Sequence, residues 1–234
     1  MTPSRTAALA SLVGLVVLCL AATLLAAAAP ENPAVEEGFV ALFNGKDTAG
    51  WVYGTKGGKT YKSGNGYQVK DGILYCTKED GGNLFTEKDY ADFVLRFDFK
   101  LEPNANNGLG VRAPLEGDIA YSGMELQILD DTGSQYTKLQ PYQYHGSIYG
   151  CVAAKRGSLK PVGEWNTQEV VAHGRHIKVT LNGNVIVDAD LDKDVTDAQV
   201  RAKHPGLERK AGRLGFLGHG TRVEFRNIRV KELK

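Results

Sequence analysis

The stretch FVLRFDFKL, residues 93–101, does most to restrict the fold of this 234-residue chain. Large apolar side chains occupy every second position, and charged or smaller side chains separate them. Successive side chains of a β-strand point to opposite faces, so the stretch predicts a strand with one apolar face. Such a strand must pack that face on a core. The inward positions are Phe93, Leu95, Phe97, Phe99 and Leu101.

Turn signals and further alternating stretches extend this pattern along the chain. Asp71-Gly72 and Asn182-Gly183 each separate two apolar runs, and both pairs favour a two-residue hairpin turn with positive φ at its centre. Short strands joined by Gly-rich turns, without a long helical period, predict an all-β protein with a β-sandwich or jelly-roll architecture. Further strands are predicted at 108–113, 123–129, 147–153, 166–172, 213–218 and 222–231.

The segment at 192–212 departs from the strand pattern. It is rich in charged residues and contains the one plausible short helix, which Pro205 and Gly206 would end. Two interpretations remain open for it: a solvated loop, or a flap over a functional site.

The first 29 residues are predicted to be a signal peptide. Arg5 precedes an apolar stretch that ends in small residues, which is typical of a signal cleaved near Ala28 or Ala29. The stretch also approaches the length of a membrane span, so an uncleaved anchor is the alternative. Cleavage would leave a linker at 30–38 and a single domain at 39–234. We expect that domain to be secreted or periplasmic and free of the membrane.

Composition excludes several function classes. The formal net charge is +1 with both signs scattered, which gives no electrostatic footprint for nucleic acid. Metal and nucleotide motifs such as CxxC, HExxH and the P-loop are absent from the sequence. Cys76 and Cys151, which follow the signal, either pair or stay free. A calcium ion bound by Asp side chains and loop carbonyls is compatible with the fold, and the sequence specifies neither this ion nor the oligomeric state.

The stretch YSGMELQILD, residues 121–130, raises the question of function. Met124, Leu126 and Ile128 share one strand face, and Glu125 and Gln127 share the other. That polar face is either solvated or a binding surface. Counting parity in neighbouring strands, we predict a groove on one sheet where the polar residues converge, namely Arg112, Glu125, Gln127, Tyr149 and His219, with His145 on the strand of Tyr149.

Each of these residues also has a purely structural interpretation. Arg112 and Glu125 would form a cross-strand ion pair, and Trp165 would be either a core aromatic or a stacking platform for a sugar. A glycosidase carboxylate pair is a further alternative, with Glu125 beside Glu164 or Asp130. Asp130 has the opposite parity to Glu125, which argues against the second pairing.

Six motifs stand in order along the chain: LFNGKDTAGW (42–51), GMELQILD (123–130), HGSIYG (145–150), KPVGEWN (160–166), KHPGLER (203–209) and GFLGHGTRVEFRNIRVKEL (215–233). Together they resemble the secreted bacterial 3-keto-disaccharide hydrolase domain family. The family has a concanavalin A-like jelly-roll fold, and the resemblance extends from about Phe39 to the end of the chain. In the last motif the residues before His219 are Leu217 and Gly218, where many family members carry polar residues.

The resemblance implies an enzyme that cleaves glycosides already oxidised at C3. A ketone at C3 acidifies the C2 proton, so a base removes that proton, the group on C1 leaves, and water adds to the enone. The chemistry requires a base, an acid and a donor to the enolate oxygen. Glu125 and His219 would be the proton carriers, with their roles left open. The substrate-binding residues would be Arg112, Gln127, His145, Tyr149, Glu164, Trp165 and Asn166.

A carbohydrate-binding module without catalysis is the alternative function, because jelly rolls carry lectins as well as glycosidases. A lectin would need aromatic platforms, whereas the enzyme needs a pair of titrating groups. The set of His219, Glu125 and Arg112 favours the enzyme. An interaction domain anchored by an uncleaved N-terminus is a third interpretation.

Overall fold

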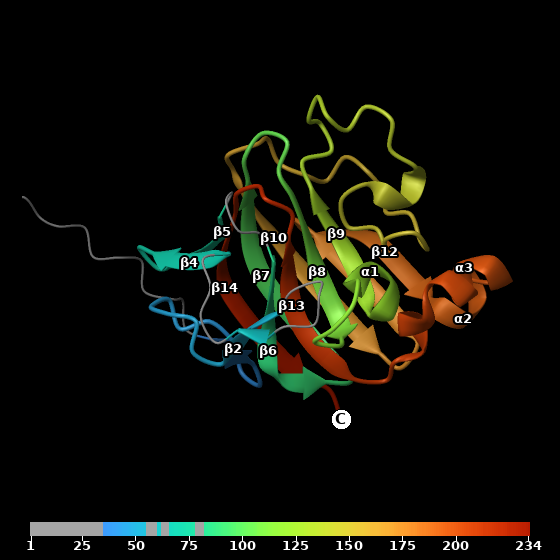
Figure 1. Cartoon of the computed structure of the whole chain (residues 1–234), viewed down its shortest axis with the longest axis horizontal. Helices are drawn as coiled ribbons and strands as arrows, with labels where there is room; N and C mark the ends of the chain where they lie inside the picture. The colour runs from blue at the N-terminus through green and yellow to red at the C-terminus, as the bar shows by residue number, and fades with distance from the viewer. Residues whose placement is uncertain (1–34, 55–59, 62–65, 78–81) are drawn as a thin grey trace, which may run out of the picture.

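The structure, a computed structural model, is a sandwich of two antiparallel sheets (Figure 1). It describes residues 35–54, 60–61, 66–77 and 82–234. This confirms the predicted all-β jelly-roll class. The larger sheet contains, in spatial order, β12 (Asn184–Asp190), β11 (His176–Leu181), β10 (Trp165–His173), β7 (Phe93–Leu101), β14 (Val223–Glu232), β5 (Ile73–Cys76) and β4 (Tyr67–Lys70), and β1 (Val40–Ala41) also pairs with β14.

The smaller sheet carries the features that matter for function. The smaller sheet lies in front of the larger sheet in Figure 1. Strand β9 is at one edge of the smaller sheet, and β8 lies next to it. Its strands in spatial order are β3 (Thr60–Tyr61), β2 (Trp51–Gly54), β6 (Gly82–Tyr90), β13 (Gly212–Gly218), β8 (Asn106–Ala113) and β9 (Met124–Leu129).

The core lies between the two sheets, and β7 supplies its centre. Buried and half-buried residues alternate without exception along this strand, which confirms the predicted inward face. Phe216 of β13 stacks on Phe225 of β14 with ring centroids 3.8 Å apart, and Phe97 meets Phe216 edge-on at 5.6 Å. Aromatic rings from both sheets therefore interlock, and burying each one removes a large apolar area from water.

The two predicted hairpins are confirmed. Asp71 and Gly72 join β4 to β5 with φ of 51° and 75°, and Asn182 and Gly183 join β11 to β12 with φ of 50° and 83°. These values belong to the mirror-image turn that Asp, Asn and Gly tolerate best. The strands predicted near 108–113, 123–129, 166–172, 213–218 and 222–231 are likewise present as β8, β9, β10, β13 and β14.

The strand predicted at 147–153 was wrong. The chain there makes turns and isolated bridges, because Gly146 and Gly150 adopt φ of 81° and 75°, which no regular strand accommodates. The segment instead covers the free edge of β9. The Gly146 amide donates to the Gln127 carbonyl at 2.7 Å, and the Tyr149 amide donates to the Glu125 carbonyl at 2.9 Å. This pairing places Tyr149 beside Glu125.

The charged segment at 192–212 forms short helices that support the wall of a cleft. It contains α2 (Leu191–Asp194), α3 (Ala198–Lys203) and the 3-10 turn η2 (Pro205–Glu208). The turn η2 packs on α1 (Ile119–Ser122), a helix that the sequence did not reveal, and the rings of His204 and Tyr121 lie 5.0 Å apart. Among the described residues no α-helix is longer than the six residues of α3, as predicted.

The predicted signal peptide and most of the linker lie outside the described residues. Within the described ranges, no helix is both long and apolar enough to cross a membrane. Cys76 and Cys151 are both free thiols, and burial raises the pKa of each to about 11. The two thiols therefore do not pair.

Candidate functional site

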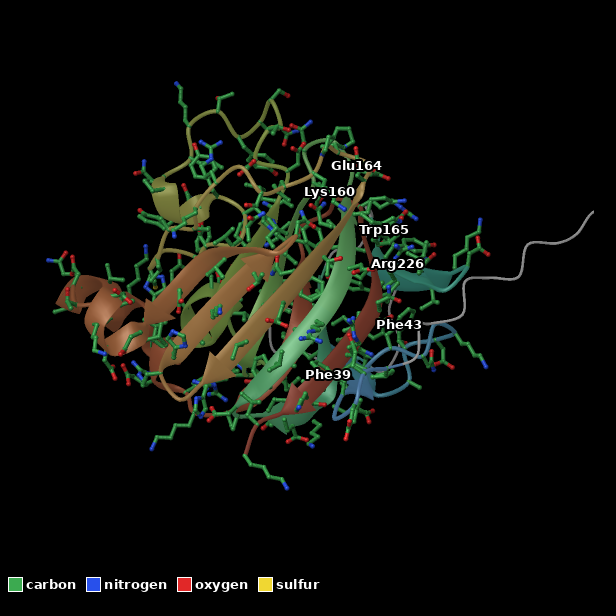
Figure 2. All side chains as sticks on the ribbon, turned by 180° about the vertical axis from the view of Figure 1, so that it is seen from behind. Phe39, Phe43, Lys160, Glu164, Trp165 and Arg226 are labelled. Atoms are coloured by element: carbon green, nitrogen blue, oxygen red, sulfur yellow. The ribbon has the colours of Figure 1, made fainter. Side chains whose placement is uncertain are left out.

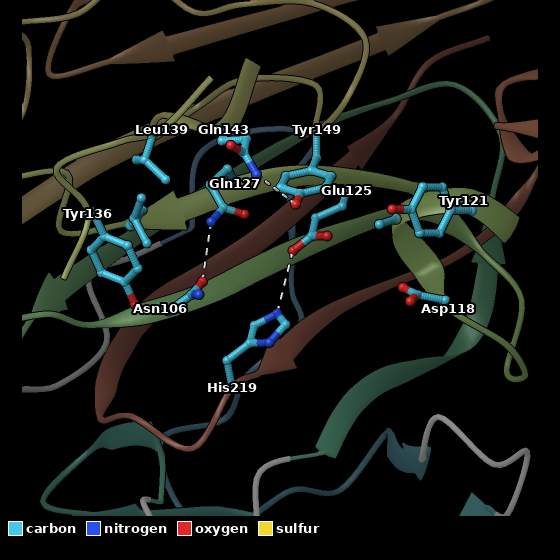
Figure 3. Close-up of a pocket in the computed structure, with 12 residues that line it drawn as sticks. Asn106, Asp118, Tyr121, Glu125, Gln127, Tyr136, Leu139, Gln143, Tyr149 and His219 are labelled. Carbon is cyan, nitrogen blue, oxygen red and sulfur yellow. Dashed lines mark hydrogen bonds and ion pairs between the residues drawn. The ribbon is translucent and has the colours of Figure 1, made fainter. Parts of the chain in front are cut away.

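A cleft of about 360 Å³ opens on the outer face of the smaller sheet (Figure 3). Its floor comes from β8 and β9, one wall from α1, and the other wall from the loop that leads from β9 through the 3-10 turn η1 (Pro141–Gln143). His219, the residue after β13, closes one side of the cleft. The lining residues are Asn106, Asp118, Ala120, Tyr121, Glu125, Gln127, Leu129, Tyr136, Leu139, Gln143, Tyr149 and His219.

Glu125 and His219 lie next to each other in this cleft, on the strand face that the parity count gave them. The Glu125 side chain is 7% exposed and the His219 side chain 47% exposed, and Glu125 Oε1 lies 3.8 Å from His219 Nε2. Within the described part of the chain, Glu125 Oε1 has no hydrogen-bond partner although it is buried. Burying a carboxylate oxygen without a hydrogen bond is costly, so its presence here calls for a reason beyond folding.

Gly108 makes room for the Glu125 carboxylate. A Cβ atom at Gly108 would lie 2.1 Å from Glu125 Oε1, well inside van der Waals contact. In the β8–β9 ladder Gly108 faces Gln127 and Gly110 faces Glu125. The Glu125 carboxylate occupies the space over Gly108, whereas Ile119 and Leu217 pack over Gly110. The carboxylate therefore lies close against the backbone of β8 at Gly108.

Amide and phenol groups form the polar wall of the cleft. Gln127 Nε2 donates to Asn106 Oδ1 at 3.2 Å, and Gln143 Nε2 donates to the Tyr149 hydroxyl at 3.0 Å. Figure 3 shows these two pairs on one side of Glu125, with Tyr121 and Asp118 on the other. Gln127 and Tyr149 thus lie in the groove as predicted, each held by an amide that the sequence did not identify.

The cleft wall is anchored by Asp130, which is not a partner of Glu125 in catalysis. Asp130 is buried and accepts hydrogen bonds from the Asn104 amide at 2.8 Å, the Thr132 amide at 3.1 Å and the Thr132 hydroxyl at 2.6 Å. These bonds fix the start of the loop that carries Tyr136 into the cleft. The carboxylate pair of Glu125 with Asp130 is therefore excluded by geometry.

Arg112 does not lie in the groove, and this corrects the prediction. Its backbone has φ of 48°, and the ladder between β8 and β13 shifts register beside it, so a bulge breaks the alternation on which the parity count relied. The side chain is 2% exposed and binds the Ala91 carbonyl at 3.0 Å, the Gly174 carbonyl at 2.8 Å and the Asp92 carboxylate at 3.0 Å. The expected ion pair with Glu125 is absent among the described contacts.

His145 is a core residue, so its predicted place in the substrate site was also wrong. Its ring stacks on Phe99 at 5.0 Å, its Nδ1 accepts from the Leu129 amide at 3.2 Å, and its Nε2 contacts Gln168 Oε1 at 3.1 Å. Complete burial lowers the pKa of His145 to about 4. A neutral imidazole that donates from Nε2 satisfies both contacts.

Trp165 is the first residue of β10 in the larger sheet and Glu164 directly precedes it, and both lie on the side away from the cleft (Figure 2). Lys100 Nζ and Arg226 Cζ lie 5.0 Å and 4.0 Å from the Trp165 ring centroid, so cations cover this ring. Asn166 is buried and accepts from the Lys160 amide at 2.9 Å. The motif KPVGEWN therefore fixes a turn, and the pairing of Glu125 with Glu164 is excluded.

Sequence reasoning missed eight of the twelve residues that line the cleft. Asn106 has the parity of Gly108 and would have been found had the predicted strand begun two residues earlier. Leu129 shares a face of β9 with Glu125 and Gln127. The remaining six come from short helical turns and loops, whose side-chain directions the period-two pattern does not predict: Asp118, Ala120, Tyr121, Tyr136, Leu139 and Gln143. Among the described residues, no three His, Cys, Asp or Glu side chains gather in a way that would hold a metal ion.

Comparisons with known proteins agree with this fold and cleft. The chain is 26% identical over 240 residues to a 3-keto-disaccharide hydrolase of Bacteroides thetaiotaomicron, covering 86% of this chain and 80% of that protein. Two crystal structures of proposed glycosyl hydrolases from Parabacteroides distasonis are also similar. One has a TM-score of 0.70 at 27% identity and covers 83% of this chain and 99% of its own. The other has a TM-score of 0.69 at 25% identity, with coverage of 87% and 99%.

A protein of unknown function with a galectin-like fold from Bacillus subtilis, at 13% identity and a TM-score of 0.50, supports the fold alone. The family match is more extensive, because one family model spans residues 38–231, which include every residue of the cleft. The chain therefore belongs to the 3-keto-alpha-glucoside-1,2-lyase-like domain family.

Proposed function

We propose that this protein cleaves 3-keto-glycosides by elimination across C1 and C2, followed by addition of water. The C3 ketone acidifies the proton on C2, a base takes that proton, and the electron pair left on C2 moves toward the C3 oxygen as an enolate. The enolate then expels the oxygen on C1, which leaves with a proton from an acid. The reaction needs one base, one acid and one donor to the enolate, and the cleft contains all three types.

Glu125 is the base in this proposal. The observation that carries it is the buried Oε1 atom without a hydrogen-bond partner among the described residues, set over the bare backbone of Gly108. The free lone pair of this oxygen is ready to accept a proton, and low exposure protects it from water. No neighbouring donor must be displaced before the C2 proton arrives.

His219 is the acid. Its Nε2 is 3.8 Å from Glu125 Oε1, and its side chain is about half exposed at the mouth of the cleft. An imidazolium beside a carboxylate carries a proton that it can give to the departing oxygen, and solvent can then restore that proton. Two groups placed this close on one side of the substrate suit the removal of one proton and delivery of another.

Tyr149 and Gln127 are the candidate donors to the enolate. The Tyr149 hydroxyl accepts a hydrogen bond from Gln143, and this directs its own hydroxyl hydrogen toward another acceptor. Gln127 is held by Asn106 with its amide over the floor of the cleft. Donors fixed before the reaction stabilise a developing oxyanion without reorganising.

A comparison of two substrates tests this function. The purified protein is incubated with a 3-keto-glucoside and with the unoxidised parent glucoside, and release of the aglycone is measured. We expect turnover of the oxidised compound alone, because the parent has no acidified C2 proton. Equal turnover of both would contradict the elimination mechanism. Binding of both without turnover would instead support a carbohydrate-binding module.

We also propose that the mature protein is exported, on the basis of the N-terminal apolar stretch and the small residues that follow it. N-terminal sequencing of the protein from its native host tests this. A mature chain that starts near Pro30 would support export, and a chain that retains Met1 and sediments with membranes would support an anchor instead.

A further inference from the structure

A second cavity of about 330 Å³ adjoins the cleft on the same face of the smaller sheet. Four residues line both cavities, and the proposed base and acid are among them: Asp118, Ala120, Glu125 and His219. Glu125 and His219 therefore lie between the two cavities. We call the first cavity the amide compartment and the second the leucine compartment, whose further lining residues are Gly82, Asn83, Gly117, Ile119, Leu217 and Gly218.

One row of side chains across the sheet shows how the two compartments differ. Asn83 of β6 faces Leu217 of β13, Leu217 faces Gly108 of β8, and Gly108 faces Gln127 of β9. Residues opposite each other in adjacent strands present their side chains on the same face. The sheet surface therefore changes from the amide of Gln127, across a glycine, to the apolar side chain of Leu217.

The floor of the leucine compartment is a small apolar cluster on the outer face of the sheet. Leu217 and Ile119 pack there with Phe85 and Ala113. Apart from the four shared residues, the described lining contains one polar side chain, that of Asn83, and three glycines. Glycines present bare backbone, which leaves a flat surface on which a planar group can lie.

We propose that the leucine compartment binds the leaving group of the substrate and that it takes aryl aglycones. The inference rests on the proposed elimination. The 3-keto sugar ring, with several hydroxyl groups to satisfy, lies in the amide compartment, where Asn106, Gln127 and Tyr149 offer polar atoms. The bond from C1 to its oxygen then lies beside Glu125 and His219. The group on that oxygen extends over Leu217.

A second sugar fits the leucine compartment less well than an aromatic ring does. A sugar leaving group would need hydrogen-bond partners for its hydroxyls, or an aromatic side chain on which to stack. The described lining of this compartment contains no aromatic side chain and, beyond the shared residues, only one polar one. A phenyl ring needs neither and gains from burial against Leu217 and Ile119.

Two substrates with the same sugar and different leaving groups test this inference. Phenyl and methyl 3-keto-glucoside are compared through the ratio of their kcat/KM values, and each variant is judged by the change in that ratio. A methyl group does not extend far enough to fill the leucine compartment. Leu217→Ala removes apolar contact and Asn83→Trp fills the space. Both should lower the phenyl-to-methyl ratio about tenfold, because apolar pocket contacts discriminate on this scale.

Leu115→Ala is the matched control, because Leu115 packs against the same apolar cluster but does not line the compartment. It should leave the phenyl-to-methyl ratio unchanged, whatever it does to stability. A ratio that stays constant in both Leu217→Ala and Asn83→Trp, with the wild type active on both substrates, would overturn this inference and leave the elimination mechanism intact. A wild type inactive on both substrates would overturn the proposed function and this inference with it.

Discussion

Arg112 and Glu125 are both buried and charged, and both lie on adjacent strands of the same sheet, yet their surroundings are opposite. Arg112 directs its guanidinium to two backbone carbonyls and the Asp92 carboxylate, at 2.8 to 3.0 Å. Glu125 has one oxygen without a hydrogen-bond partner among the described residues, and the half-exposed imidazole of His219 lies 3.8 Å from that oxygen. One buried charge is fully satisfied and the other is not.

The difference separates a residue that holds the fold from one that performs chemistry. A buried charge with every hydrogen bond made contributes to a unique structure, and removing its partners leaves them unpaired. A buried charge with a free oxygen costs stability, and active sites are where such a cost is retained. The comparison therefore predicts that mutating Arg112 affects stability and mutating Glu125 affects turnover.

The largest effect is expected from Glu125→Gln. The change keeps the shape of the side chain but removes its ability to take a proton. We expect turnover of a 3-keto-glucoside to fall by roughly 10² to 10⁴, the usual contribution of a positioned acid or base. The free energy of unfolding should stay the same or rise, because the amide is less costly to bury. His219→Ala should lower turnover in the same range.

Glu164→Gln is the matched control for that variant. It makes the same chemical change at an exposed position on the far sheet. Turnover should be unaffected, and the free energy of unfolding should change by less than about 0.5 kcal/mol. If the two Glu→Gln variants retain equal activity, Glu125 is not the base.

Arg112→Met should lower the free energy of unfolding by about 3 kcal/mol, because the Ala91 and Gly174 carbonyls lose a buried donor and Asp92 keeps only the Gly174 amide. Urea denaturation measures this. Turnover per folded molecule should equal that of the wild type, because Arg112 lies outside the cleft. Arg156→Met, at an exposed arginine 3.8 Å from Asp131, should cost no more than about 1 kcal/mol. Equal losses in the two variants would refute the distinction.

The stability of the fold should depend on pH through His145. Burial lowers the pKa of this imidazole from an ordinary 6.5 to about 4, so between these values the unfolded chain binds a proton that the folded chain does not. The contribution of neutral His145 to the free energy of unfolding is therefore fully present above pH 6.5. The free energy of unfolding falls by about 3 kcal/mol as the pH drops to 4. Denaturation in urea at several pH values measures the slope. His145→Gln should flatten it, and an unchanged slope would show that other groups are responsible.

Gly108→Ala should reduce turnover by about tenfold to a hundredfold with little change in melting temperature. The added methyl group forces the Glu125 carboxylate to move, because a Cβ at Gly108 would lie 2.1 Å from Oε1. A displacement of about 1 Å at a reacting group has an effect on this scale. The loss should appear in kcat rather than KM. A variant with normal kcat would show that the position of this carboxylate is not critical.

Strand parity predicted the fold and only the regular part of the site. Glu125, Gln127 and His219 were placed correctly because β9 and β13 keep their alternation up to the cleft. Arg112 was misplaced because of the bulge beside it, and His145 because its segment turns at Gly146 instead of extending. Bulges and glycine turns are decided by contacts between distant segments, which a period-two pattern does not encode.

Carrying out the reaction in D₂O tests the central claim most directly. Elimination removes the proton from C2, so the 3-keto sugar released by the wild type should carry solvent deuterium at C2, after correction for exchange by the free product alone. Glu125→Gln should introduce this deuterium roughly 10² to 10⁴ times more slowly. A released sugar that keeps its original C2 proton would mean direct hydrolysis, and it would contradict the assignment of Glu125 as the base.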